Sequence, residues 1–494
     1  MISWPYTTTT TLLLLLGAAA WPYWTYNSTD LRSPRLKINA TGTTESGFIF
    51  IGPRGDVQPA GRAPLIYDND GNLVYEGPEQ VVANFRVQQL KGIDVITFWA
   101  GEMLPDMGYG YGSVHILDNT YQEIHTITLT DYFVTPDNSS KDSYIDMHES
   151  LITSQNTILV TAYNVTQHNL TSIGGGSADW ILDSQFYEID IETNQVLRSW
   201  SALDQGADIA LTTSHKKLGV SVGTQNTPYD AYHINSIAVT SNGYFISLRH
   251  MWTGYYISQN GTVLWRISGE DGGDFAQVGD ASFSWQHDMR IYNETETSLV
   301  VTLFSNGNTP TEHKGPSTGV SLAVDLVEKQ VSRLRSLIDP DDIIRSVSQG
   351  SYQLLTQSDD HVFIGYGSIS KVKEFDGEGN RIFSAQFGDD DTVASYRGYR
   401  YQWSAIPFWK PSIKVFPADD GATVYMSWNG ATDYDNWVVY SATSETSVDN
   451  QRIGSVKRTG FETSVTLTNL STTYFQVVAC QGDRILGSSE IVSF

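Results

Sequence analysis

Cysteine is nearly absent from this sequence of 494 residues, and its absence restricts how the fold can be stabilised. Cys480 is the only cysteine, so the chain can form no internal disulfide and no zinc site built from thiolates. Stability must therefore come from apolar burial, and a chain of this length can bury a large core. The length also exceeds that of one ordinary domain, which predicts a large body and an accessory module.

Basic residues are also scarce. The sequence has 30 Lys and Arg against 55 Asp and Glu, which gives a formal net charge of -25 at neutral pH. A charge of this sign repels phosphate backbones and anionic lipids, which argues against nucleic acid as a partner. It would also repel a small anionic substrate, so any such substrate would need a local cationic pocket.

Long apolar segments are missing, apart from one run at residues 11–23 that ends in small residues. This run is too short to span a bilayer and is typical of a secretion signal, although no Lys or Arg precedes it. The alternative is a buried N-terminal element. We expect residues 1–20 to be a signal peptide and the mature protein to be secreted, soluble and without a stable membrane anchor.

Asparagine acceptor sites for glycosylation agree with a secretory route, because eight Asn-x-Ser/Thr sequences occur. They predict glycosylation at Asn27, Asn39, Asn138, Asn164, Asn169, Asn260, Asn293 and Asn469.

Helical periodicity is scarce, whereas one strand pattern recurs six times. An alternating apolar run, a turn rich in Asp, Asn or Gly, and a second alternating run predict a β-hairpin each time. The turns lie roughly 50 to 75 residues apart, which favours one four-stranded blade per repeat. We therefore expect an all-β fold, a six-bladed β-propeller over residues 24–410; two packed β-sandwiches are the alternative. The hairpins lie at 66–75, around 116–119, at 188–197, at 256–265, around 324–329 and at 374–383.

The sequence changes character after the prolines at Pro407, Pro411 and Pro417. Short alternating strands follow at the spacing of a small sandwich. They predict a fibronectin-type β-sandwich accessory domain over 411–494, with a seventh blade as the alternative.

Four short segments, 146–149, 232–236, 247–250 and 285–288, carry histidines and an arginine. In the hairpin over 233–250, a three-residue turn at 241–243 would place Asn235 opposite Arg249. His233, Asn235 and Arg249 would then share one face, while His250 would point away and lie outside the site. A two-residue turn would break this register, and a solvated hairpin rim is the alternative.

His287 beside Asp288 and His148 beside Glu149 are further candidates. Each is also compatible with an ordinary core or surface histidine, and His148 with a metal ligand. No His-x-His or His-x3-His pair supports a metal centre, so we expect no metal. No Gly-x-Ser-x-Gly sequence supports a serine hydrolase of that type.

Taken together and in this order, the four segments resemble the arylsulfotransferase family, in its fungal secreted branch. Further matching stretches extend the resemblance over roughly residues 45 to 410; they lie at 47–50, 84–87, 188–193, 265–269 and 396–397. The resemblance implies a six-bladed propeller with its site at the central channel. It also implies sulfuryl transfer from an aryl sulfate to a phenol through a sulfohistidine, without any cofactor.

Residue by residue, His287 matches the nucleophile of the family. His148, His233, Asn235 and Arg249 match the residues that hold the sulfuryl oxygens and serve the leaving phenolate. The chain departs from the pattern at Ser305, where an Asp is usual, and at Ser268, where a Gly is common; the cysteine pair of bacterial relatives is also missing.

Two other functions fit the sequence. One is a non-catalytic extracellular propeller that binds glycans or proteins, and the other is a hydrolase that passes the sulfuryl group to water.

Overall fold

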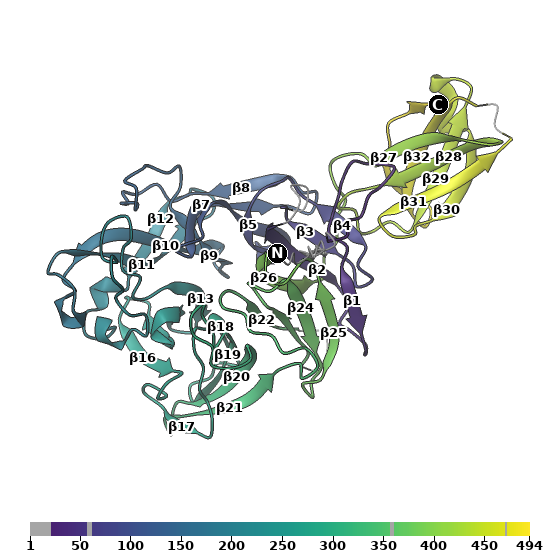
Figure 1. Ribbon diagram of the computed structural model, residues 1–494. Coiled ribbons are helices and arrows are strands. Elements are labelled where there is room, and N and C mark those ends of the chain that lie inside the picture. Colours follow the sequence, from purple (N-terminus) through teal and green to yellow (C-terminus); the bar gives the residue numbers. More distant parts are fainter. Residues whose placement is uncertain (1–20, 57–61, 356–359, 470–471) are drawn as a thin grey trace, which may run out of the picture.

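The computed structural model describes residues 21–56, 62–355, 360–469 and 472–494, so the predicted signal peptide at 1–20 lies outside it. The described residues form strands and short 3-10 turns, which confirms the all-β class. Figure 1 shows a large body of sheets with a smaller C-terminal domain that extends from one side. Among the described residues, no helix has the length and apolar character needed to cross a membrane.

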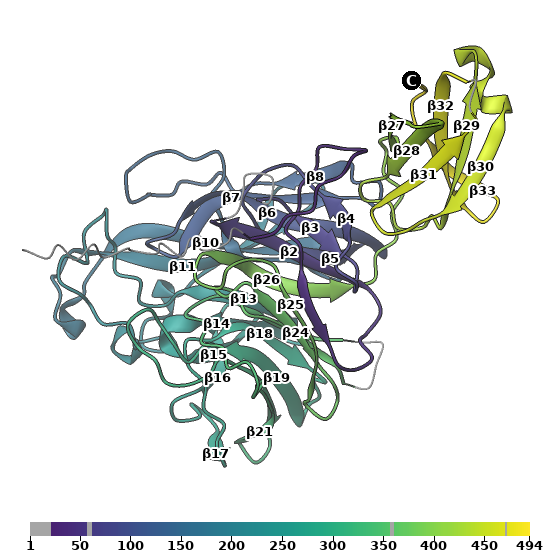
Figure 2. The same cartoon turned by 45° about the vertical axis from the view of Figure 1, so that its right-hand side comes forward.

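The large body divides into six antiparallel units of four strands, blades 1 to 6, arranged around a common centre (Figures 1 and 2). Blades 2 and 3 are joined into one eight-stranded sheet by the pairing of Gly112 with Ile145. The innermost strands contact one another in a closed ring, in the order β26, β5, β9, β13, β18, β22. Blade 1 closes the ring because it joins β26, from the end of the body, to β2, β3 and β4 from its beginning. Such closure leaves few free sheet edges, and it is the arrangement of a β-propeller rather than of two sandwiches.

Each blade runs from an inner strand at the hub to an outer strand at the rim. In that order, blade 1 contains β26 (Val393–Tyr401), β2 (Phe48–Gly55), β3 (Leu65–Tyr67) and β4 (Leu73–Glu76). Blade 2 contains β5 (Val82–Leu90), β6 (Ile93–Leu104), β7 (Tyr109–Leu117) and β8 (Glu123–Ile127). Blade 3 contains β9 (Ile145–Ile152), β10 (Thr157–His168), β11 (Asp179–Asp190) and β12 (Val196–Ser201).

Blade 4 contains β13 (Ile234–Thr240), β14 (Gly243–Leu248), β15 (Thr253–Ser258) and β16 (Val263–Ser268). Blade 5 contains β18 (His287–Tyr292), β19 (Ser298–Ser305), β20 (Thr318–Asp325) and β21 (Gln330–Leu337), with β17 (Ala276–Val278) at its edge. Blade 6 contains β22 (Ser351–Leu354), β23 (Val362–Gly365), β24 (Lys371–Phe375) and β25 (Arg381–Gln386), with β1 (Lys37–Ala40) at its edge. The 3-10 turns of the body are η2 (Thr171–Ile173), η3 (Leu203–Gln205), η4 (Leu211–Thr213) and η5 (Arg249–Met251).

All six predicted hairpins are present, and each is the outer strand pair of one blade: β3–β4, β7–β8, β11–β12, β15–β16, β20–β21 and β24–β25. The repeated sequence pattern therefore corresponds to the hairpin at the rim of each blade. Local turn chemistry and strand alternation suffice to specify such a hairpin.

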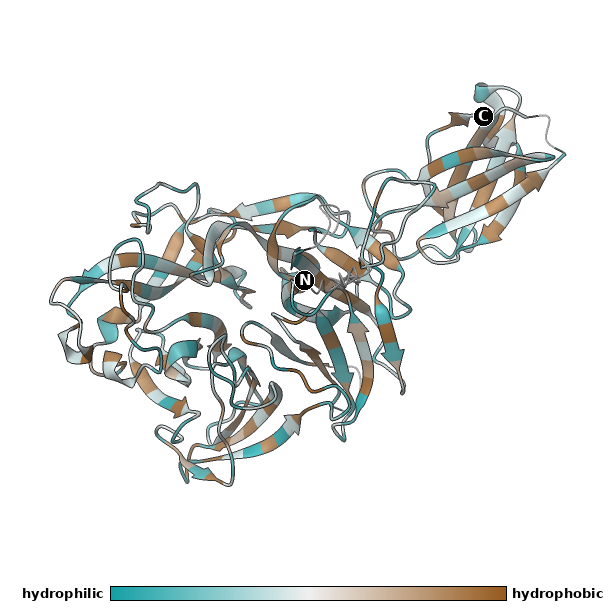
Figure 3. Ribbon diagram, in the orientation of Figure 1, coloured by the Kyte–Doolittle hydropathy of each residue, from teal (hydrophilic) through white to brown (hydrophobic). Residues whose placement is uncertain are grey.

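Apolar side chains fill the space between neighbouring blades. One cluster joins Phe245 of blade 4 to Met289 and Leu299 of blade 5, and another joins Ile49 of blade 1 to Phe363 of blade 6. Apolar positions alternate with polar ones along many strands (Figure 3). Each buried large side chain contributes about 1.5–3 kcal/mol, so the blade interfaces hold the ring together without disulfides.

Buried charges join the inner strands at the hub. Glu149 on β9 is fully buried, 2.6 Å from Arg290 and 3.0 Å from Arg86. Arg397 lies 3.4 Å from the same carboxylate, and Asp288 lies 2.7 Å from Arg290. The three arginines come from β18, β5 and β26, so Glu149 links four inner strands. Burial alone would raise the pKa of Glu149, but the three guanidinium groups hold it well below its ordinary value.

The C-terminal domain has two sheets of its own and does not add a seventh blade to the ring. One contains β27 (Ser412–Ala418), β28 (Gly421–Ser427) and β31 (Glu462–Thr468); the other contains β29 (Asn436–Ala442), β30 (Arg452–Lys457), β32 (Tyr474–Gln481), β33 (Arg484–Ser488) and β34 (Val492–Ser493), and η6 is Glu445–Asn450. Both sheets contribute to one apolar core around Trp437. The domain contacts the body through Gly430, whose N–H donates to Val74 O at 2.7 Å.

Seven of the eight predicted glycosylation acceptors are exposed, and Asn164 is half-buried. The side-chain oxygen of Asn164 accepts a hydrogen bond from Val134 N at 2.9 Å, so this acceptor is engaged in the fold.

Candidate active site

A cavity of about 1180 Å³ opens where several inner strands of the ring begin. Its wall includes all four histidine and arginine residues that the sequence indicated, His148, His233, Arg249 and His287. These residues come from blades 3, 4 and 5. The first and the last, His148 and His287, are 139 positions apart in the sequence, so the tertiary structure brings them together. Asn235 does not line the cavity, whereas His250 does.

The predicted register of the 233–250 hairpin is wrong. Thr240 pairs with Gly243 and Val239 pairs with Tyr244, so the turn has two residues rather than three. Gly243 is the first residue of the strand and pairs with Thr240 and Ser258. The position requires glycine, because a Cβ there would lie 2.1 Å from Ile257 O of the neighbouring strand. The register shifts again at Asn235, and β14 ends at Leu248, so Asn235 does not lie opposite Arg249.

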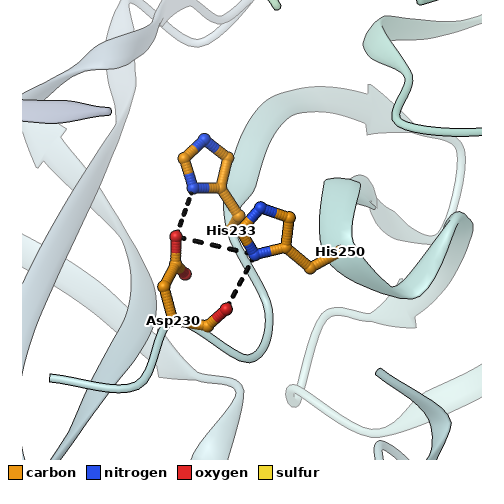
Figure 4. Close-up of side chains that lie close together, drawn as sticks. All are labelled: Asp230, His233 and His250. Carbon is orange, nitrogen blue, oxygen red and sulfur yellow. Dashed lines mark hydrogen bonds and ion pairs between the residues drawn. The ribbon is translucent and has the colours of Figure 1, made fainter. Parts of the chain in front are cut away.

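His250 was expected to point away from the site, and this expectation is also wrong. The chain leaves β14 into the 3-10 turn η5, which brings the ring of His250 to 4.7 Å from that of His233. Figure 4 shows that both rings contact Asp230. His233 Nδ1 lies 2.6 Å from Asp230 Oδ2, while His250 Nδ1 lies 2.7 Å from the backbone oxygen of Asp230.

These contacts determine which nitrogen of His250 carries the proton. A carbonyl oxygen only accepts, so Nδ1 donates to Asp230 O and Nε2 keeps a lone pair. Arg249 Nη1 lies 3.1 Å from Nε2 and donates to it. Burial holds the pKa of His250 well below its ordinary value, although Asp230 opposes the shift. His250 is therefore a neutral ring that orients Arg249.

Asp230 and the two histidines are also a group whose possible ligand atoms all lie within 4.8 Å of one another. The spacing in the sequence did not indicate such a group. The 2.6 Å separation of His233 Nδ1 from Asp230 Oδ2 is a hydrogen bond, because two ligands of one tetrahedral zinc ion lie about 3.3 Å apart. Arg249 beside His250 further disfavours a divalent cation. The arrangement suits an anion better than a metal.

His148 is held in the same manner by a second carboxylate. Its Nδ1 lies 2.6 Å from Asp146 Oδ2, and both residues are buried. Asp146 also accepts from Gly110 N and Thr161 Oγ1, both at 3.0 Å. Burial alone would raise the pKa of Asp146, but the contacts with His148 lower it. With Nδ1 bound to a carboxylate, Nε2 of His148 is the nitrogen left for a substrate.

His287 is buried and bonded at both ring nitrogens. Nδ1 lies 2.6 Å from Asn306 Oδ1, and Gln349 N donates to Nε2 at 3.1 Å. The amide nitrogen of Asn306 donates to Ser346 O and Gln349 O, which leaves only its oxygen for His287. Nδ1 therefore carries the proton and Nε2 keeps the lone pair. Burial lowers the pKa of His287 far below its ordinary value, and Arg249 lowers it further, so the ring is neutral.

Arg249 is buried and forms no ion pair with a carboxylate in the part of the chain that the structure describes. Its Nη2 donates to Val347 O at 2.9 Å, and its guanidinium lies 5.1 Å from the ring centre of Trp285. Burial lowers its pKa to about 10, which still leaves the group charged at neutral pH. A buried cation without a counter-ion is suited to bind an anion.

Asn235 acts behind the cavity rather than on its wall. It is fully buried, and its Nδ2 donates to Gln286 O at 2.7 Å, directly before His287. Asn84 makes the same contact with Met147 O, also at 2.7 Å and directly before His148. Two asparagines thus hold the backbone of two cavity histidines in place.

His250 was expected to lie outside the site, and four other residues of the site were not singled out from the sequence: Asp230, Asn306, Gln349 and Arg54. Only Asp230 had a local signal, a carboxylate three positions before His233. The two departures from the family pattern, Ser268 and Ser305, do not line the cavity. Each hydroxyl oxygen accepts a backbone hydrogen bond, Ser268 from Glu270 N and Ser305 from Ser284 N, both at 3.2 Å.

Comparison with known proteins identifies a family. A model of the arylsulfotransferase (ASST) family matches residues 86–388, which is more than half of the chain. The four predicted catalytic residues lie within this range. No curated protein matches the sequence significantly.

Solved structures with detectable similarity are distant. The allergen Mala s 1 of Malassezia sympodialis is 10% identical, with 78% of this chain and 92% of that chain covered and a TM-score of 0.34. The periplasmic gluconolactonase of Pseudomonas aeruginosa is 10% identical, with 71% and 99% covered and a TM-score of 0.34. Similarities this low carry no argument about function.

Proposed function

Because the chain belongs to the arylsulfotransferase family, we propose that it transfers a sulfuryl group from an aryl sulfate to a phenolic acceptor, through a sulfohistidine on His287. The observation that supports this most is the hydrogen bonding of His287. Nδ1 donates to Asn306, so Nε2 carries a lone pair in a ring that shares a cavity with Arg249. A neutral, oriented imidazole beside an unpaired guanidinium is what attack on an anionic sulfate ester requires.

In the first half-reaction, Nε2 of His287 forms a bond to sulfur while the bond from sulfur to the aryl oxygen breaks. The electron pair of the broken bond leaves on the phenolate oxygen. Arg249 offsets the negative charge of the sulfuryl oxygens, and His148 or His233, each held by a carboxylate, gives the phenolate a proton.

In the second half-reaction, the acceptor phenol returns a proton to the same histidine as its oxygen attacks sulfur. The N–S bond breaks and its electron pair restores the lone pair of His287. The proton count is thereby balanced over the cycle.

In the proposed reaction, Gln349 acts through its backbone N–H. Its N–H faces the lone pair that must attack, at 3.1 Å. An incoming sulfate ester has to displace this hydrogen bond, after which the same N–H can donate to a sulfuryl oxygen.

The expectations about location and domains extend the proposal. We propose that residues 1–20 direct secretion and that the exposed asparagine acceptors are glycosylated. We also propose that residues 24–410 form the catalytic unit and that 411–494 are a fibronectin-type accessory domain. Aryl sulfates and phenols are the proposed partners.

Incubation of the purified protein with a chromogenic aryl sulfate, with and without an added phenol, tests the function. Transfer predicts phenol release that the acceptor stimulates, together with a sulfated acceptor. Release that is independent of acceptor indicates hydrolysis instead. If no phenol is released under either condition, the proposal is contradicted, and the non-catalytic binding propeller is the function that remains.

A further inference from the structure

The buried and half-buried arginines at the hub and on the cavity wall fall into two groups. Arg86, Arg290 and Arg397 pair with Glu149, and Arg400 lies 3.1 Å from Glu374. Within the described ranges, Arg54 and Arg249 have no carboxylate partner, and both line the cavity. Arg249 is accounted for by the proposed reaction, whereas Arg54 is not.

Arg54 lies near the end of β2, in the blade that closes the ring and outside the part matched by the family model. Its Nη2 donates to Gln349 Oε1 at 2.5 Å, while its Nη1 is buried without a hydrogen-bond partner. A buried donor without an acceptor costs free energy that an arriving anion would recover. Burial also lowers the pKa of Arg54 to about 10, so the group stays charged at neutral pH without a counter-ion.

Gln349 connects Arg54 to the reaction centre. Its side-chain oxygen holds Arg54, and its backbone N–H holds Nε2 of His287. One glutamine residue therefore separates the second guanidinium from the attacking nitrogen. We therefore expect a benzene ring with two anionic substituents to contact both positions.

The charge of the cavity wall fits an anionic ligand. Arg54, Arg62, Lys216, Lys217 and Arg249 line it, against three acidic residues, Glu102, Asp106 and Asp230. Acidic residues outnumber basic ones by 55 to 30 in the whole chain, so this wall reverses the overall balance. Two of the three carboxylates are already engaged, Glu102 by Lys141 at 2.8 Å and Asp230 by His233.

We infer that Arg54 forms a second anion subsite, which selects aryl sulfates and phenols that carry a carboxylate or another anionic group on the ring. The inference rests on the proposed function, because the first anion is the sulfuryl group beside His287. In a ping-pong reaction donor and acceptor occupy the cavity in turn, so the same subsite would act on both.

Equilibrium binding of sulfonates tests the subsite without turnover, because their C–S bond does not transfer. We would measure 3- and 4-sulfobenzoate, each against the carboxamide of the same shape, by titration calorimetry at one ionic strength. At least one isomer is expected to bind at least about tenfold tighter than its carboxamide. In Arg54→Gln this ratio should fall close to one, and in Arg54→Lys, which keeps the charge, it should be intermediate.

Arg345→Gln is the matched control, because Arg345 is exposed and does not line the cavity; it should retain the wild-type ratio. Equal binding of acid and carboxamide to wild type would overturn the inference, as would a ratio that survives in Arg54→Gln. Should Arg54→Gln fail to fold, a wild-type ratio in Arg54→Lys at raised salt would overturn it, since a charge-based preference weakens there. Sulfuryl transfer without these preferences would refute only the subsite, and the preferences without transfer would refute only the proposed function.

Discussion

The backbone N–H of Gln349 donates to Nε2 of His287 at 3.1 Å, so the nitrogen proposed to attack sulfur is occupied in the free protein. Asn306 holds the other ring nitrogen at 2.6 Å. Two groups thus fix the orientation of the ring, and a substrate has to displace only the hydrogen bond from Gln349 before Nε2 can attack.

His287→Ala should abolish phenol release from an aryl sulfate, with a loss of at least about a thousandfold, because the covalent carrier is gone. Intact-mass analysis of wild type treated with donor alone should detect one added sulfuryl group, which the variant lacks. His125→Ala, a change on β8 away from the cavity, is the control and should keep full activity. Substantial release by folded His287→Ala protein would rule out the sulfohistidine.

Asn306→Asp should shift the acid limb of the pH–rate profile to higher pH. The new carboxylate beside Nδ1 would favour the imidazolium form and raise the pKa of His287, which burial now holds far below its ordinary value. Activity would then be lost at a pH at which wild type is still active. The measurement is kcat/KM between about pH 5 and 8. An unchanged limb would mean that His287 is not the group that titrates.

Asp230→Asn should reduce kcat by about 10²–10⁴-fold if His233 supplies the proton to the phenolate. Burial lowers the pKa of His233, and Asp230 opposes that shift. Removal of the charge should therefore lower the pKa further and move the alkaline limb of the profile to lower pH. Asp146→Asn is the matched variant for His148, so the variant that moves the limb identifies the proton donor.

Glu149→Gln should destabilise the protein by about 3–5 kcal/mol, because three buried guanidinium groups lose their shared counter-charge. Denaturant unfolding measures the loss. Glu490→Gln removes an exposed carboxylate 2.8 Å from Lys410 and should cost less than about 1 kcal/mol. Similar losses in both variants would contradict the role of the hub charges.

The stability of Glu76→Gln relative to the wild type should be greater at pH 8 than at pH 4.5. Burial raises the pKa of Glu76 from 4.5 to about 8, so the folded state keeps a proton that the unfolded state releases. The contribution of Glu76 to stability is therefore full below pH 4.5 and is lost as the pH rises toward 8. The variant should gain more than about 1.4 kcal/mol over this range, the equivalent of one pKa unit. Glu79→Gln at an exposed neighbouring position controls for net charge, and an equal gain there would contradict the prediction.

The hairpins were predictable because each one depends on neighbouring residues. Turn residues such as Asp68 and Gly71 shape the loop between β3 and β4, where Asp68 O accepts from Gly71 N at 3.1 Å. No such local rule specified the turn after Thr240. Gly243 looked like a loop residue, but the backbone of Ile257 on the next strand requires a glycine at that place within the sheet.

The cavity histidines were predictable as residues but not as a geometry. Motif order identified His148, His233, Arg249 and His287, and all four line the cavity. The 3-10 turn η5 reversed the expected direction of His250, and ring closure brought Arg54 from β2 to Gln349 beside β22. Both outcomes depend on contacts between residues far apart in the sequence.

By itself, the sequence determined the all-β class, the six rim hairpins, the dependence on apolar burial and the histidines and arginine that gather in one place. Strand alternation and turn chemistry are local, and a single cysteine excludes a disulfide wherever the chain goes. Only the tertiary structure decided which nitrogen of His287 keeps its lone pair, which carboxylate holds each histidine, and which arginines lack a counter-ion. The hydrogen bonds of His287 join residues 19 and 62 positions apart, so no single segment contains both partners. Asp146 and Asp230 lie only two and three positions before their histidines, but the fold decides that each carboxylate faces the ring.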